Sequence, residues 1–200
     1  VCNPSRTSLL TGKYPTTVGV LDNETWFGIA HPDLASLPKH FKNNGYVSLR
    51  SGKIFHGGID DFEAWTEGGE PRNFEGPRRP PRTTPQEARI QQSDRIVKLE
   101  GQGESHHDFQ AADRAIEYLR KYRDQPFFLA CGFTKPHSPP TAPYSYFDWY
   151  DQNSIPLPVN FGPRPQVPTG FPARSVTRTG DLFINRDATE EQAREMIEAY

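Results

Sequence analysis

The chain has 200 residues, a formal net charge of −2 at pH 7 and a pI near 6.3. This balance excludes the basic field expected of a nucleic-acid-binding protein, and the sequence contains no apolar run of membrane length. Its two cysteines cannot form a disulfide framework, and its 20 prolines and 16 glycines favour an enzyme with elaborate loops over a helical bundle.

The first element in chain order is a short helix predicted over residues 2–12, CNPSRTSLLTG. Pro4 suits a first helical turn, Leu9 and Leu10 can face a core, and Gly12 can end the helix in a left-handed cap.

Cys2 therefore lies at a predicted helix N-terminus, where backbone N–H groups and the helix dipole favour an anion. Arg6, about one turn further on, adds a fixed cation and so favours a sulfate or phosphate ester. The alternative is that Cys2 is only a small buried hydrophobe, which leaves Arg6, Thr11 and Gly12 unexplained.

The same run resembles the type I sulfatase signature C-x-P-S-R-x-x-x-L-T-G at every specified position. In that family a maturation enzyme oxidises the cysteine to formylglycine, whose hydrate attacks sulfur and also contacts a Ca²⁺ ion. The resemblance implies these roles for Cys2. It makes Lys13 a weaker candidate for substrate binding, because many members have Arg there.

A second helix is predicted to begin at Ser36 as N-cap, with Pro38 in its first turn, and to end near residues 44–45. Residues 46–50 follow as a short strand. The order of helix, glycine turn and strand is typical of an α/β fold.

The loop after this strand carries Lys53 and His56, at the kind of strand end where α/β proteins bind ligands. A loop lysine and histidine are by default solvated. The pattern G-K-x-x-H resembles the iduronate-2-sulfatase-like branch of the family. That resemblance implies that Lys53 binds the sulfate and that His56 contacts the formylglycine.

Residues 57–104 are predicted to form an irregular surface insertion. Asp60 and Asp61 could be a metal-binding pair, but we favour a solvated loop because the family's aspartate pair precedes the cysteine motif. The basic Pro-rich run at residues 77–82 is typical of an exposed linker, although its arginines could help to hold an anionic polymer.

The strongest helical pattern covers residues 105–124, and its predicted face against a sheet is Phe109, Ala112, Ile116 and Leu119. His106 and His107 fall in its first turn, where a solvated position is favoured over a metal or catalytic role.

Residues 126–133 form an apolar run that predicts a central parallel strand covered on both faces, with Cys131 in the core. Lys135 and His137 follow in the loop at its carboxyl end. An apolar strand running into K-P-H resembles the iduronate-2-sulfatase-like enzymes, which implies that His137 lies in the active site and that Lys135 binds sulfate.

The remaining chain predicts an aromatic-rich short helix at residues 142–150 and an irregular insertion at residues 154–180. Residues 187–190 resemble a capping box. The helix that follows has the predicted apolar face Ala193, Met196, Ile197 and Tyr200.

The resemblance implies the α/β sandwich of the alkaline phosphatase superfamily, in which a mixed, mostly parallel sheet lies between helices. Residues 1–200 are expected to form one partial catalytic domain with the two insertions, 57–104 and 154–180. The chain starts inside a motif without an initiator Met, so we expect a fragment of a longer protein.

The implied reaction is hydrolysis of a sulfate monoester, with a sulfated sugar such as a 2-O-sulfated uronate as substrate. Arg6, Lys53 and Lys135 would stabilise negative charge together with Ca²⁺, whose remaining ligands would lie outside this chain. His56 would orient or deprotonate the hydrate, and His137 would bind sulfate or protonate the leaving oxygen. An exported protein, whether periplasmic, secreted or lysosomal, is expected.

Two other function classes stay open at this point. A phosphodiesterase or phosphonate monoester hydrolase of the same superfamily could carry a similar formylglycine motif. A non-catalytic protein that binds sulfated glycans would keep the cations and lose the nucleophile, and the intact motif around Cys2 argues against it.

Overall fold

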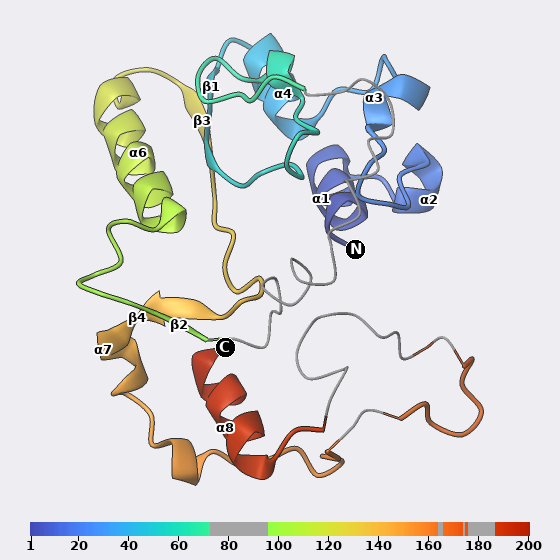
Figure 1. Ribbon diagram of the computed structural model, residues 1–200. Helices are drawn as coiled ribbons and strands as arrows, with labels where there is room; N and C mark the ends of the chain where they lie inside the picture. Colours follow the sequence, from blue (N-terminus) through green and yellow to red (C-terminus); the bar gives the residue numbers. More distant parts are fainter. Residues whose placement is uncertain (73–95, 164–165, 174, 176–186) are drawn as a thin grey trace. The chain divides into compact units, whose positions relative to one another are not determined.

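A computed structural model describes residues 1–72, 96–163, 166–173, 175 and 187–200 (Figure 1). Its contacts divide the chain into two compact units, Val1–Arg79 with Ser105–Thr134 and Pro80–Glu104 with Lys135–Tyr200. The single partial domain expected from the sequence stays a prediction. The basic Pro-rich run at residues 77–82 lies outside the described residues.

The first unit is built on two parallel strands, β1 (Val47–Gly52) and β3 (Phe127–Gly132), paired in register from Val47↔Phe127 to Gly52↔Gly132. Helix α6 (His107–Tyr122) connects them and packs on one face of the pair, and α4 (Leu37–Asn43) packs on the other face (Figure 1). Because the strands are parallel, their carboxyl ends meet at one edge, as the predicted α/β fold requires.

Helix α4 begins and ends close to where the sequence predicted. The Ser36 hydroxyl accepts a hydrogen bond of 3.4 Å from the Lys39 N–H, and Pro38 occupies the first turn. Phe41 stacks on Phe128 of β3 with ring centroids 4.6 Å apart, and this contact fixes the helix on the sheet.

Helix α6 packs on the sheet through a different face from the one predicted. Its buried residues are Ala111 and Ala115, whereas Ile116 and Leu119 are 43% and 45% exposed. The helix lies so close to the strands that a Cβ added at Gly52 would be 2.9 Å from the Ala111 Cβ. Only small side chains fit such an approach, so the alanines face the sheet.

Helix α1 (Cys2–Thr11) ends at Gly12 with φ 66°, which confirms the predicted left-handed cap. Leu10 is buried as expected, but Leu9 is 77% exposed and does not face a core. The buried stripe instead continues from Leu10 through two polar residues, Asn3 and Thr7, at helical spacing.

In the described part of the first unit, an apolar cluster joins α1 to the loop after β1. Helices α2 (Pro15–Val18) and α3 (Phe27–Ala30) also contribute to it. The buried members of this cluster are Leu10, Val18, Val20, Phe27, Ile54, Phe55 and Trp65. Trp65 follows the short 3₁₀ helix η1 (Phe62–Ala64), so residues 57–72 are irregular but packed, and the predicted surface loop is wrong there.

Strand β3 is an edge strand in the described part of the chain, because it pairs with β1 on one side and with no other described strand. Cys131 is exposed, which corrects the prediction that it lies in the core. Among the described strands, β3 has a neighbour along one edge only, and some of its side chains, including Cys131, therefore stay in contact with water.

The second unit contains a short parallel pair, β2 (Val97–Leu99) and β4 (Thr141–Pro143), followed by α7 (Tyr144–Phe147) and the 3₁₀ helix η2 (Gln152–Ser154). The sequence did not predict the pair, because three residues are too few to display strand periodicity. The aromatic-rich helix is correspondingly shorter than predicted.

The last helix of this unit, α8 (Glu190–Ala199), has the predicted capping box two residues later than expected. Thr189 is the N-cap, and its hydroxyl accepts from Gln192 N–H while the Gln192 side chain accepts from Thr189 N–H, both at 3.1 Å. Met196 is buried, whereas Ile197 is 42% exposed.

Candidate functional site

The start of α1 is bound to the loop after β1 through one guanidinium group. Arg6 Nε donates to the Sγ of Cys2 at 3.3 Å, and Arg6 Nη1 donates to the carbonyl oxygens of Lys53 and Ile54 at 2.8 and 2.9 Å. The structure therefore brings together Cys2, Arg6 and the backbone of Lys53, which the sequence had proposed as separate site residues. The cation lies beside the sulfur and has little freedom to move.

Asn3 secures the first turn of α1, and sequence reasoning did not identify it. Its buried Nδ2 donates to the carbonyls of Asp22 and Thr25 at 2.9 and 2.7 Å, and its N–H donates to Asn23 Oδ1 at 2.9 Å. Its Oδ1 accepts from the Thr7 hydroxyl at 3.2 Å. These bonds fix the residue next to Cys2. The sequence could have indicated this role, because Asn3 is a polar residue on the same helical face as Leu10, and a buried polar side chain needs hydrogen-bond partners.

Two glycines allow Lys53 to sit where β1 and β3 both end. Gly52 has φ 72°, and Lys53 N–H donates to the Gly132 carbonyl at 2.8 Å. A Cβ on Gly132 would lie 2.0 Å from the Lys53 carbonyl oxygen, so a larger residue cannot occupy this position without a shift of the backbone. Lys53 is thus placed at the edge where the carboxyl ends meet.

A cavity of about 690 Å³ opens at this edge of the first unit. It is lined by Arg50, Gly52, Lys53, Phe55, His56, Gly57, Gly68, Gly69, Glu70, His107, Gln110, Ala111, Arg114 and Thr134. Lys53 and His56 therefore share one cavity, and their assignment to a ligand site stays a prediction. Cys2 and Arg6 do not line it, but they are joined to it through the backbone of Lys53.

Lys13 is not brought to this cavity. It is exposed, it follows the cap of α1, and its N–H lies 3.4 Å from the Thr11 hydroxyl oxygen. The structure offers no contact between its side chain and the other candidate residues in the described part of the chain.

Lys135 and His137 belong to the second unit, in the loop before β4. Lys135 Nζ donates to the carbonyls of His137 and Pro139 at 2.9 and 2.6 Å. His137 Nδ1 lies 2.7 Å from the Ser138 carbonyl. A carbonyl only accepts, so Nδ1 carries the proton, and a neutral His137 can accept a proton at Nε2.

Asp60 and Asp61 are buried, which corrects the solvated loop predicted for them. Asp60 accepts from Trp65 Nε1 at 3.0 Å and from Glu70 N–H at 2.8 Å, and Asp61 accepts from the Ser36 hydroxyl at 2.7 Å. Burial raises the pKa of Asp60, opposed by the Glu70 N–H and by the Arg50 guanidinium. These carboxylates hold residues 59–70 in place.

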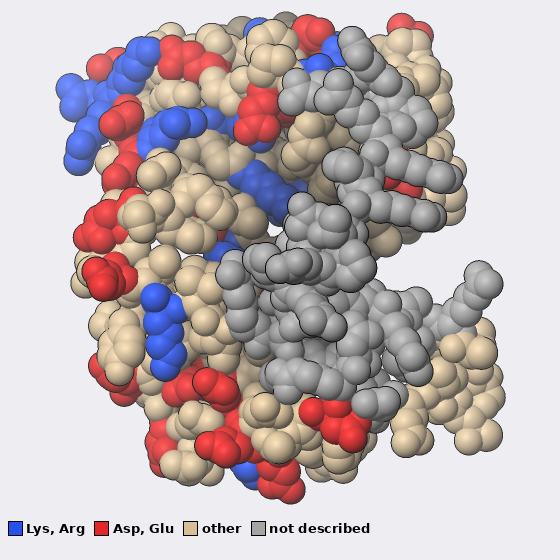
Figure 2. All heavy atoms as spheres, viewed as in Figure 1, with Lys and Arg blue, Asp and Glu red and all other residues tan. Residues whose placement is uncertain are grey.

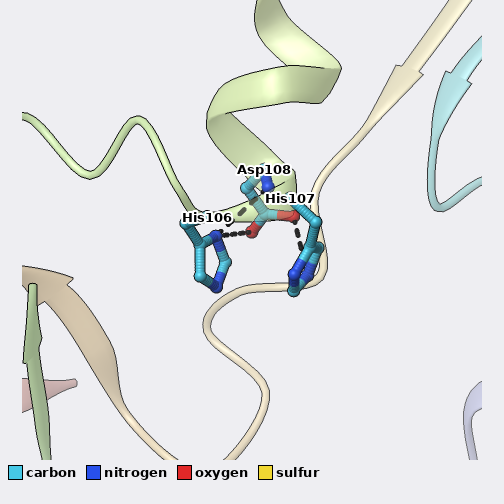
Figure 3. Close-up of side chains that lie close together, drawn as sticks. All are labelled: His106, His107 and Asp108. Atoms are coloured by element: carbon cyan, nitrogen blue, oxygen red, sulfur yellow. Dashed lines mark hydrogen bonds and ion pairs between the residues drawn. The ribbon is translucent and has the colours of Figure 1, made fainter.

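His106, His107 and Asp108 form the one cluster of three metal-type donors found in the described residues, with ligand atoms within 4.8 Å of one another (Figure 3). His106 Nδ1 accepts from the Asp108 N–H at 3.1 Å and so caps α6. His107 Nε2 lies 3.3 Å from Asp108 Oδ1, which also accepts from Thr134 N–H at 2.8 Å. His107 is exposed as predicted, whereas His106 is half-buried.

The described residues do not supply a site that suits Ca²⁺, which takes six to eight oxygen ligands. Asp60 and Asp61 are buried among the protein's own donors, and the cluster at the start of α6 offers two imidazoles and one carboxylate. Such a donor set suits a transition metal better than calcium.

Figure 2 shows acidic and basic side chains interspersed on the face in view, without a broad basic field among the described residues. In the same part of the chain no helix combines the length and the apolar composition that a bilayer crossing needs.

Comparison with known proteins identifies the family. The sulfatase family model matches residues 1–178. Human iduronate 2-sulfatase is 32% identical over 86% of this chain and 32% of its own length, and a sulfatase of Formosa agariphila is 32% identical over 79% and 34%. An ulvan-active sulfatase of Formosa agariphila is 27% identical over 96% and 36%.

The chain spans about a third of the length of these curated relatives. The family match, by contrast, covers most of the chain and includes the Cys2 motif, the Lys53 loop and the strand before Lys135. The sequence-based identification and the predicted α/β fold are thereby confirmed: the chain belongs to the sulfatase family.

Proposed function

We propose that the protein hydrolyses sulfate monoesters and that Cys2, converted to formylglycine, is its nucleophilic residue. The observation that supports this most directly is the Arg6 guanidinium, which lies 3.3 Å from Cys2 Sγ and holds the backbone of Lys53 at the same time. A sulfuryl transfer site needs a nucleophile next to fixed cations, and this contact supplies both.

One hydroxyl of the formylglycine hydrate would attack sulfur while the S–O bond to the substrate alcohol breaks, and the alcohol would leave with a proton. The other hydroxyl would then lose its proton, and the aldehyde would re-form as the C–O bond to sulfate breaks and sulfate leaves. Around the hydrate, Arg6 positions the residue and adds positive charge. The N–H groups at the start of α1 and the Lys53 ammonium stabilise the negative charge that develops on the sulfate oxygens.

His56 lines the same cavity as Lys53, and we assign to it the orientation or deprotonation of the hydrate. His137 is assigned to the sulfate or to the leaving oxygen. Its Nδ1–H is held by the Ser138 carbonyl, so Nε2 is the atom that exchanges the proton. Lys135 now contacts two carbonyls of its own loop and would exchange one of them for a sulfate oxygen.

No step proposed here uses Ca²⁺, because the described residues do not provide its ligands. Calcium, a formylglycine-generating maturation enzyme and an exported location are carried over from the family alone. For the substrate we propose a sulfated sugar such as a 2-O-sulfated uronate. One relative is named iduronate 2-sulfatase, and another is named as a sulfatase active on ulvan.

The test compares turnover of an aryl sulfate with turnover of an aryl phosphodiester by the native protein, produced together with a formylglycine-generating enzyme. We expect the sulfate to be preferred and Cys2→Ala to abolish its hydrolysis. Preference for the phosphodiester would favour the phosphodiesterase or phosphonate hydrolase class. Binding of sulfated glycans without any turnover would favour a non-catalytic binding protein.

A further inference from the structure

Helix α6 contributes a second cation to the cavity that holds Lys53. Arg114 lines this cavity, and so do His107 and Gln110 from the first turns of the same helix. In the described part of the chain, neither the Arg114 guanidinium nor the Lys53 ammonium has a hydrogen bond or an ion pair. Lys121, outside the cavity on the same helix, is instead bound to Glu67 at 2.5 Å.

The cavity has an excess of positive charge. Its acidic lining residue is Glu70, which is paired with the Arg50 guanidinium at 2.9 Å, and Arg50 also lies 3.8 Å from Asp60. Arg50 is therefore neutralised by its partners. Among the described residues, Lys53 and Arg114 remain as two positive charges without an ion-pair partner in one concave site, and such a site concentrates anions.

The size of the cavity exceeds what one sulfate needs. Its volume of about 690 Å³ lies within the range of roughly 300–1,000 Å³ that is usual for sites of small organic ligands. A sulfated sugar that engages Lys53 through its sulfate can therefore extend along α6 toward Arg114. The planar guanidinium fork matches the two oxygens of a carboxylate or sulfate.

We propose that Arg114, assisted by His107, forms a second anion subsite. It binds a carboxylate or a second sulfate group on the sugar that carries the scissile sulfate. This inference rests on the proposed function for the role of Lys53, and it adds a specificity-determining residue: sugars with two anionic groups are preferred over sugars with one.

The experiment compares Arg114→Gln with Arg120→Gln, a matched change on the same helix at a residue that does not line the cavity. Four substrates are used: an aryl sulfate, a neutral sugar monosulfate, a 2-O-sulfated uronate and a neutral sugar disulfate. For Arg114→Gln we expect kcat/KM to fall roughly 10-fold or more on one or both of the last two, with the first two unchanged.

The pattern of losses also identifies the ligand. A loss confined to the uronate indicates a carboxylate, and a loss confined to the disulfate indicates a second sulfate. Equal losses on all four substrates, equal losses in both variants, or no loss at all would overturn the proposal. Thermal unfolding of each variant shows that the fold is retained.

A wrong proposed function can be distinguished from a wrong assignment of the Arg114 subsite. If the native protein turns over none of the four sulfates, sulfate ester hydrolysis is wrong. Calorimetric binding of the same sugars to Cys2→Ala protein, with and without Arg114→Gln, then tests the subsite directly. Weaker binding of the doubly anionic sugars alone supports it, and equal affinities in both proteins contradict it.

Discussion

Arg6 and Lys53 are 47 residues apart in sequence, and the Nη1 of Arg6 donates to the carbonyl of Lys53 at 2.8 Å. The same guanidinium holds Cys2 through Nε, so the N-terminus of α1 and the end of β1 are one structural unit. Motion of the Lys53 loop would break a charged hydrogen bond, and the loop is therefore kept close to Cys2.

Arg6→Lys keeps the charge but cannot reproduce these bonds, because one ammonium cannot reach the sulfur and both carbonyls. We expect a loss of about 1–3 kcal/mol in the free energy of unfolding, measured by urea denaturation. Arg120→Lys is the control and should leave stability unchanged. Equal stability of the two variants would mean that the Arg6 contacts do not contribute to folding.

The two cysteines should respond differently to modification and to mutation. Peptide mass spectrometry of the native protein, produced with a formylglycine-generating enzyme, should show an aldehyde at Cys2 and an unchanged thiol at Cys131. Because Cys131 is exposed, Cys131→Ala should change stability by no more than about 0.5 kcal/mol. Full activity with an unmodified Cys2 thiol would contradict the proposed nucleophile.

Lys53→Ala should lower kcat by roughly two to three powers of ten, with a smaller effect on KM, since its charge is needed most in the transition state. Lys39→Ala on α4, outside the cavity, is the control. Steady-state kinetics with an aryl sulfate measure both constants. A change in KM alone would assign Lys53 to ground-state binding.

Gly52→Ala should destabilise the protein by about 2–5 kcal/mol, because it combines a positive φ with overpacking. The new Cβ would lie 2.1 Å from the Gly132 carbonyl oxygen and 2.9 Å from the Ala111 Cβ. Gly57→Ala, with open space around its Cβ, should stay within about 0.5 kcal/mol. Urea midpoints compare the two, and similar midpoints would contradict the close approach of the strands.

The raised pKa of Asp60 leads us to expect that the free energy of unfolding depends on pH. Its pKa in the folded protein is raised above its ordinary value of 3.8, mainly by burial. The folded state therefore holds this proton when the unfolded state has lost it, and the stability contributed by Asp60 falls as pH rises through that window.

The measurement is urea denaturation of the native protein and of Asp60→Asn between about pH 3 and pH 6. The difference in unfolding free energy, native minus variant, should decrease as the pH rises. An increase with pH would mean that the Arg50 guanidinium and the Glu70 N–H outweigh burial and lower the pKa of Asp60 instead.

Local features were readable from the sequence alone. The cap at Gly12, the N-cap at Ser36 and the parallel strand at residues 127–132 appear where the pattern indicated. Each depends on the conformational preference of one residue or on the hydrophobicity of a short run. The family motif likewise needs only residue identity and spacing, so membership in the sulfatase family was accessible without a structure.

Tertiary packing determines which face of a helix or strand is buried against the rest of the protein. The sequence predicted a sheet-facing stripe through Ile116 and Leu119, but the close approach of α6 to Gly52 admits only alanines. It also predicted that Cys131 is buried, but the described residues around β3 leave this side chain exposed. Periodicity reports an apolar stripe and does not specify the partner that will cover it.

In the candidate site too, the sequence indicates the residue types, and the tertiary structure determines their contacts. Residue types and spacing identified Cys2, Arg6 and Lys53 as candidates, and the chemistry assigned to each follows from its side chain. That Arg6 binds the Lys53 backbone, that Asp60 is buried, and that Arg114 shares a cavity with Lys53 depend on contacts between distant segments. The cavity that Arg114 shares with Lys53 needs the end of β1 and helix α6 to meet, which happens only when the parallel crossover closes.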